Sequence, residues 1–210
     1  MGGYKNGTVY RHTQLYKFLS MCDSTPLERV VLDCGAGGEC PPLGLFWEHG
    51  YKTLGIEADD LQIMEAKEFE NNRGMELNIL KGDMRKLPFQ DSSLSFAYSY
   101  NSIFHMKKTD VLQSINEIRR VLKPGGLCFV NLLSIRDFRY GSGEKIGSGE
   151  YYQDEGDSTV IHSYFADDEG DDYFKELDVI YKEIRVINRL VQGHWIKQGY
   201  VDYVARRKSS

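Results

Sequence analysis

The sequence predicts one α/β domain built on a mostly parallel sheet with helices on both faces. An apolar run at residues 30–34 ends beside an acidic residue and opens at once into a glycine-rich turn. A second such run, residues 51–57, also ends in an acid, and strand patterns alternate with helix patterns from there on. Apolar, β-branched runs bounded by glycines are typical of parallel strands buried on both faces.

The first predicted strand, residues 30–34, is followed by Gly35 and Gly37. Glycine permits backbone conformations and a close approach that a Cβ atom would forbid. Ligands of open α/β sheets bind at the carboxyl ends of the strands. We therefore expect a nucleotide-like ligand at this turn. The alternative is a tight strand-to-helix turn that binds nothing.

The residues around the turn favour one cofactor class over another. A dinucleotide-binding turn has a third glycine at the position that Cys40 occupies here. Asp33 precedes the turn, where its carboxylate would repel a pyrophosphate. S-adenosylmethionine (SAM) carries a sulfonium and an ammonium group that suit this acid, and its carboxylate can use free amides at the next helix N-terminus.

The second and third strands end in residues that suit an adenosine. Glu57 can accept hydrogen bonds from both ribose hydroxyls, although NAD enzymes share this acid and the alternative is a helix cap. Residues 77–81 predict the third strand, followed by Asp83 and Met84. The Asp83 carboxylate can bind an adenine amino group and Met84 can contact the ring. The alternative role for Asp83 is that of a turn former.

The remaining elements continue the alternation. Residues 91–100 and 127–133 predict strands, and the helix between them has an apolar stripe. The stripe consists of Val111, Ile115, Ile118 and Leu122. Residues 165–177 predict an acidic helix, and residues 179–190 and 195–205 predict an antiparallel hairpin. Residues 10–22 predict an N-terminal helix. Its inward side chains are Leu15, Phe18 and Leu19.

The chain contains four motifs, which in chain order are LDCGAGGE, GIEADD, KGDMRKLPF with DSSLSFAYS, and RRVLKPGG. These motifs resemble those of the class I SAM-dependent methyltransferases, type 11 group. The resemblance spans roughly residues 29–134. It implies a Rossmann-like three-layer α/β/α sandwich with a seven-stranded sheet. The implied strand order is 3-2-1-4-5-7-6, with strand 7 antiparallel.

The resemblance also implies the cofactor-binding residues. They would lie around the methionine end, the ribose, the adenine and the reacting centre of SAM. The residues are Asp33, Gly35, Ala36, Gly37, Glu57, Ala58, Asp83, Met84 and Ser99. The implied reaction is methyl transfer by in-line displacement from SAM to an unidentified small-molecule acceptor, with S-adenosylhomocysteine as product. The alternatives are a SAM- or nucleotide-binding regulatory module without transfer activity and, third, an NAD-dependent oxidoreductase.

The acceptor side carries fewer signals. His105 is a candidate general base, and the alternative is packing at the pocket rim. The segment after the fourth strand lacks the Asp/Asn-Pro-Pro-aromatic loop of enzymes that methylate amino groups of nucleic acids. Residues 134–165 form an insertion, rich in glycine and tyrosine, that we expect to cover the acceptor pocket. It is either a mobile lid or an ordinary surface loop.

Composition agrees with one domain over residues 1–210, which begins with a helical segment at 1–24. The chain has 210 residues, 41% of them hydrophobic, and a formal net charge of −5 without a basic stripe. We therefore expect no nucleic-acid partner. No apolar run has membrane-spanning length, which predicts a cytoplasmic protein without a membrane partner. The four cysteines show neither disulfide nor metal-ligand spacing, so no metal is expected. The sequence carries no signature of an oligomeric state.

Overall fold

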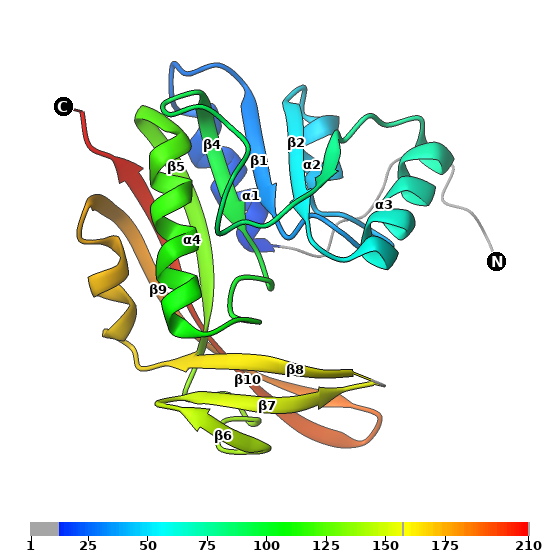
Figure 1. The fold of residues 1–210 in the computed structure, drawn as a ribbon, viewed down its shortest axis with the longest axis vertical. Helices are drawn as coiled ribbons and strands as arrows, with labels where there is room; N and C mark the ends of the chain where they lie inside the picture. The colour runs from blue at the N-terminus through cyan, green and yellow to red at the C-terminus, as the bar shows by residue number, and fades with distance from the viewer. Residues whose placement is uncertain (1–12, 157, 210) are drawn as a thin grey trace.

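A computed structural model of the protein describes residues 13–156 and 158–209 (Figure 1). Seven strands form the main sheet in the order β3-β2-β1-β4-β5-β10-β9. Their bounds are β1 Val30–Cys34, β2 Lys52–Glu57, β3 Ile79–Lys81, β4 Leu94–Ser99, β5 Leu122–Ser134, β9 Leu177–Val191 and β10 His194–Arg207. The first five strands run parallel, and β10 is antiparallel to β5 and β9. The predicted strand order, with an antiparallel seventh strand, is confirmed.

Helices cover both faces of this sheet, because successive strand residues point to opposite sides. The helices are α1 Thr13–Asp23, α2 Leu43–Glu48, α3 Asp60–Arg73 and α4 Lys108–Val121. Val31 of β1 packs in one apolar cluster with Phe18 of α1 and Phe46 of α2. Leu32 packs in the opposite cluster with Ile115 of α4. The expected three-layer arrangement follows from this alternation.

Helix α1 confirms the predicted N-terminal helix over the residues that the structure describes. Leu15, Phe18 and Leu19 are all buried, as their spacing indicates. The Phe18 ring contacts Phe46 and Phe129 edge-on or tilted, with ring centroids 6.1 and 5.8 Å apart. Residues 10–12, which the sequence assigns to the same helix, lie outside the described residues.

The insertion after β5 forms an antiparallel meander of three further strands, which we call the meander. Its strands are β6 Glu144–Gly147, β7 Glu150–Glu155 and β8 Ser158–Phe165. Two residue pairs, Leu133–Tyr164 and Ser134–Phe165, join β8 to the end of β5. Figure 1 shows the meander lying across the end of the sheet toward which β1 points. The insertion is therefore regular β structure in place of the expected loop.

The prediction of a helix over residues 165–177 is wrong. Phe165 ends β8, a short 3₁₀ turn η1 covers Glu169–Phe174, and Leu177 begins β9. A Cβ atom on Gly170 would lie 2.7 Å from the Tyr203 hydroxyl, so this turn packs closer to the sheet than a longer α-helix would. The Phe174 ring stacks on Tyr203 with centroids 4.4 Å apart, and this inward position agrees with the sequence.

The predicted C-terminal hairpin is present as β9 and β10. Gln192 and Gly193 form its two-residue turn, with φ of 50° and 82°. Two successive positive φ values are the signature of the turn that matches the twist of paired strands. Among the helices of the described residues, none is long and apolar enough to cross a membrane.

Candidate active site

The turn after β1 packs tightly against two other segments. Gly35 has a φ of +94°, and a Cβ atom there would lie 1.9 Å from the Ser102 hydroxyl oxygen. The backbone amides of Gly35 and Ala36 both donate to the Ile56 carbonyl, at 2.8 and 3.2 Å. The Ala36 side chain is fully buried. The turn is thereby fixed on the end of β2, and only glycine fits its first position.

Glu57 ends β2 beside this turn. One carboxylate oxygen accepts a hydrogen bond from the Gly37 amide at 3.1 Å, and the other accepts from the Ala58 and Asp59 amides at 2.8 and 3.0 Å. Helix α3 is capped by Asp59, whose carboxylate accepts from the Gln62 amide. Glu57 is therefore not the cap of this helix, and three backbone amides fix its carboxylate in place.

A cavity of about 360 Å³, which we call the turn cavity, opens between the turn after β1 and the turn after β3. Five of the residues predicted to bind the cofactor line it together: Gly35, Glu57, Ala58, Asp83 and Met84. Arg85 donates to both oxygens of the Asp83 carboxylate and thereby lowers the pKa of this carboxyl. Asp83 is therefore charged at the cavity wall, and both of its oxygens already accept hydrogen bonds from Arg85.

A wider space of about 670 Å³, the open cavity, adjoins the turn cavity. Gly37 lines it together with Glu57, His105 and Glu155. A Cβ atom on Gly37 would lie 2.5 Å from the Gln62 Cβ, so this glycine also permits a close approach of two segments. Six of the nine predicted cofactor residues thus meet around two adjoining cavities.

The remaining three, Asp33, Ala36 and Ser99, are buried and line neither cavity. Burial raises the pKa of the Asp33 carboxyl well above its usual value; a hydrogen bond with Tyr98 opposes this rise, and the charge of Glu57 adds to it. The Ser99 hydroxyl donates to the Cys34 carbonyl at 2.8 Å and ties β4 to β1. These side chains lie within the sheet layer that supports the turn.

A third cavity, about 220 Å³, lies on the other side of His105 and is called the polar cavity here. Its polar side chains come from five segments, and include Asn101, Asp137, Arg139, Glu155, His162 and Gln198. The loop that carries His105 is held firmly. The Asn131 side chain accepts from the Asn101 amide and donates to the Asn101 side chain, both at 2.7 Å.

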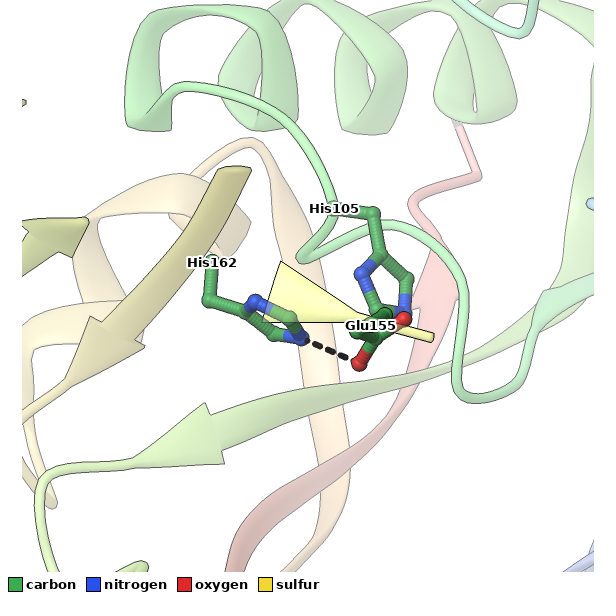
Figure 2. A group of neighbouring side chains, drawn as sticks. All are labelled: His105, Glu155 and His162. Atoms are coloured by element: carbon green, nitrogen blue, oxygen red, sulfur yellow. Dashed lines mark ion pairs between the residues drawn. The ribbon is translucent and has the colours of Figure 1, made fainter. Parts of the chain in front are cut away.

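His105 is the predicted residue that lines all three cavities. Figure 2 shows its ring, the His162 ring and the Glu155 carboxylate turned toward one another. The Nε2 atom of His162 lies 3.0 Å from a Glu155 oxygen, and the two imidazole centroids are 4.6 Å apart. His105 comes from the loop after β4, whereas Glu155 and His162 come from β7 and β8.

Sequence reasoning missed this cluster, because its members are far apart in the chain and follow no spacing rule. The available signal was an acid and a histidine within the insertion that follows the fifth strand. Residues 155 and 162 lie on the same face of the β7–β8 pair, since Glu155 pairs with Ser158 and Tyr151 pairs with His162. That face meets the loop that carries His105.

The electrostatics of the cluster favour neutral imidazoles beside a charged carboxylate. Burial lowers the pKa of His105, and burial together with the neighbouring His105 lowers the pKa of His162 to about 4. Burial alone would raise the pKa of Glu155, but the two imidazoles and Arg139 outweigh it and lower the pKa. Near neutral pH both rings therefore carry a free electron pair.

A family model described as a methyltransferase domain matches residues 32–130. A sterol 24-C-methyltransferase of Pneumocystis carinii is 37% identical over 102 residues, which are 47% of this chain and 26% of that enzyme. The corresponding enzyme of Saccharomyces cerevisiae is 33% identical over 101 residues, 46% of this chain and 25% of that enzyme. The chain thus aligns with about a quarter of the length of these relatives.

Solved structures extend the likeness to nearly the whole chain. A SAM-dependent methyltransferase of Methanosarcina mazei superimposes with a TM-score of 0.71 at 21% identity, covering 97% of this chain and 100% of that one. A 1,6-didemethyltoxoflavin-N1-methyltransferase of Burkholderia thailandensis, solved with S-adenosylhomocysteine, gives 0.66 at 14% identity, over 94% of this chain and 76% of that one. Residues 32–130 are therefore similar in sequence to a methyltransferase domain, and the chain shares its fold with solved SAM-dependent methyltransferases.

Proposed function

We propose that this protein transfers a methyl group from SAM to a small polar molecule. The observation that carries the proposal is the position of His105, which lines both the turn cavity and the polar cavity. A ligand in each cavity would meet the other at this residue. Alignment of two reactants is a large catalytic contribution, since well-oriented groups reach effective molarities of about 10⁵ M or more.

The residues around the turn cavity fit SAM. Glycine at positions 35 and 37 lets the turn after β1 pack against Ser102 and Gln62 without a clash, and the turn so placed lines the turn cavity and the open cavity. The Glu57 carboxylate has about four lone-pair sites and gives three to backbone amides, so acceptor capacity remains for a ribose hydroxyl. Ile56 and Met84 add apolar surface for an adenine ring. When bound, SAM supplies an electrophilic methyl group.

The polar cavity supports a small, hydrophilic acceptor. Its volume of about 220 Å³ is below the ~300–1,000 Å³ typical of sites for drug-sized ligands. Arg139, Asp137 and Gln198 contribute charged and amide groups to its wall. The named substrates of the fungal relatives are sterols, which are large and apolar, so we propose a different acceptor class for this chain. A cytoplasmic location and the absence of a nucleic-acid partner stay predictions from the sequence.

The test is to incubate the protein with methyl-labelled SAM and a cell extract, and then to separate polar small molecules, lipids, proteins and nucleic acids. Label is expected in the polar small-molecule fraction. Glu57→Ala should abolish the label, whereas Glu68→Ala, an exposed change on α3, should preserve it. Label in the lipid fraction would contradict the polar acceptor, and SAM binding without any labelled product would contradict methyl transfer.

A further inference from the structure

We propose that His105, Glu155 and His162 bind a divalent transition-metal ion of the zinc class, between the turn cavity and the polar cavity. The three residues each offer one ligand atom, and these atoms all lie within 4.8 Å of one another. Two imidazoles and one carboxylate are an established ligand set for zinc sites that also bind a substrate or water. The binding site stands without the proposed methyl transfer, but its role at an acceptor rests on that function.

The side chains need only a small adjustment to close around an ion. Metal–ligand bonds of about 2.0–2.2 Å place the ligand atoms of a tetrahedral site roughly 3.4 Å apart. His162 and Glu155 are already 3.0 Å apart, so the adjustment falls mainly on His105. His105 lies in the loop after β4, which is only half-buried at this residue. Figure 2 shows the three groups converging from separate segments.

Within the described part of the chain, the cluster holds a buried polar atom without a partner. Only 3% of the His162 side chain is exposed, and its Nδ1 has no hydrogen-bond partner among the described residues, so this nitrogen is free to bind a ligand. An Arg139 nitrogen donates to one Glu155 oxygen at 2.9 Å. Ligating carboxylates are commonly held by such a donor, which orients the second oxygen toward the ion. The positive charge of Arg139 weakens the binding of a cation, so the Glu155 carboxylate and the two imidazoles together must supply the affinity.

A simple ion pair does not account for the cluster. The contact between His162 and Glu155 explains why these two side chains lie together. It does not explain the position of His105, which comes from the loop after β4. Its ring meets the His162 ring nearly edge-on, at an interplanar angle of 68°. Three potential ligands from three segments around one point are an arrangement that a bound ion would stabilise.

Three protein ligands leave one coordination position open, and the polar cavity adjoins it because all three residues line this cavity. The ion would hold an oxygen donor of the acceptor there. A metal-bound hydroxyl loses its proton more readily, and that proton passes to solvent. With the ion in place, no protein side chain has to act as the general base, the role that the sequence suggested for His105. The acceptor class that follows is a small molecule with a hydroxyl or similar oxygen ligand.

The test uses the full chain without a histidine tag, stripped with a chelator, dialysed against Zn²⁺ and analysed by elemental mass spectrometry and calorimetry. One zinc ion per chain is expected. His162→Gln and Glu155→Gln should each weaken Zn²⁺ binding at least tenfold. His194→Gln, an exposed residue of the β9–β10 hairpin, and Cys40→Ser, an exposed cysteine, should bind Zn²⁺ like the wild type.

Two outcomes would overturn the proposal: no zinc retained after dialysis, or equal zinc binding by the wild type and Glu155→Gln. Glu155 is exposed at the end of β7, so its amide variant is expected to fold even where a change at the buried His162 is not. Labelled product from zinc-free protein would overturn the role at the acceptor. Zinc binding without any labelled product would leave the metal site and remove the proposed function.

Discussion

The Glu57 carboxylate accepts a hydrogen bond from the Gly37 backbone amide at 3.1 Å. This bond joins the end of β2 to the turn after β1, so the residue proposed to hold the ribose also shapes the turn. Under the proposed function, the same carboxylate binds the ribose and also positions the turn.

We expect Glu57→Ala to weaken SAM binding at least tenfold, which corresponds to about 1.4 kcal/mol. The change removes the proposed ribose acceptor and leaves three backbone amides without their partner. Titration calorimetry with SAM measures the loss, with Glu68→Ala as the matched control on α3. Unchanged affinity in a folded Glu57→Ala protein would remove Glu57 from the cofactor site.

Gly35→Ala should abolish measurable SAM binding. The new Cβ atom would lie 1.9 Å from the Ser102 Oγ, and the backbone at φ +94° is strained for alanine. Adding Ser102→Gly removes the clash but not the strain, so the double variant should recover part of the affinity. Calorimetry on both variants tests this, and equal loss in the two would show that the clash is not the cause.

Asp33→Asn should change how stability depends on pH. Burial raises the folded-state pKa of Asp33 above 3.8, so the stability that its protonated form contributes is present below about pH 4 and is lost as the pH rises through the folded pKa. Asparagine stays neutral. The difference in unfolding free energy between the variant and the wild type should therefore grow in favour of the variant above about pH 4.

Urea denaturation at a series of pH values measures this difference. Parallel curves for the two proteins would mean that the Asp33 pKa is the same in the folded and unfolded chains. If Asp33 also serves the cationic end of SAM, the variant should gain stability and lose SAM affinity at the same pH.

Ser99→Ala should cost about 1–3 kcal/mol of unfolding free energy, because the Cys34 carbonyl loses its donor inside the protein. Ser95 lies on the same strand and is equally buried, but its hydroxyl has no hydrogen-bond partner within the described part of the chain. Ser95→Ala should therefore be neutral or stabilising. Denaturant midpoints of the two variants compare the serines directly, and equal losses would contradict the role assigned to the Ser99 bond.

The sequence predicted the main sheet because its strands carry strong local signals. Apolar runs end beside Asp33 and at Glu57, and the two-residue turn at Gln192 and Gly193 determines the C-terminal hairpin. The meander was missed for the opposite reason. In β7 the buried residues are Tyr151 and Gln153, so its inward face is not the apolar alternation that predicts a strand.

The sequence also indicated which residues would gather around the turn cavity and the open cavity, because these residues follow strand ends at fixed places in the motifs. Their role in cofactor binding stays a prediction. The cluster of His105, Glu155 and His162 could not be predicted from the sequence, because Glu155 and His162 reach His105 only through the packing of β7 and β8 against the loop after β4. Local sequence patterns carry no information about such a meeting. The false helix at residues 165–177 has a similar cause, because Gly170 packs against Tyr203, far away in the chain.

Within the described residues, β8 pairs with the main sheet at two positions alone, Leu133–Tyr164 and Ser134–Phe165, and the segment that matches the family model stops at residue 130. The meander nevertheless takes part in every cavity of the site, because Ile161 lines the turn cavity and Glu155 lines both the open cavity and the polar cavity. Under the proposed function, an exchange of residues 144–165 would therefore change the wall of the acceptor and part of the wall of the methyl donor together. A chimera built at these positions is expected to need matching changes in the loop that carries His105.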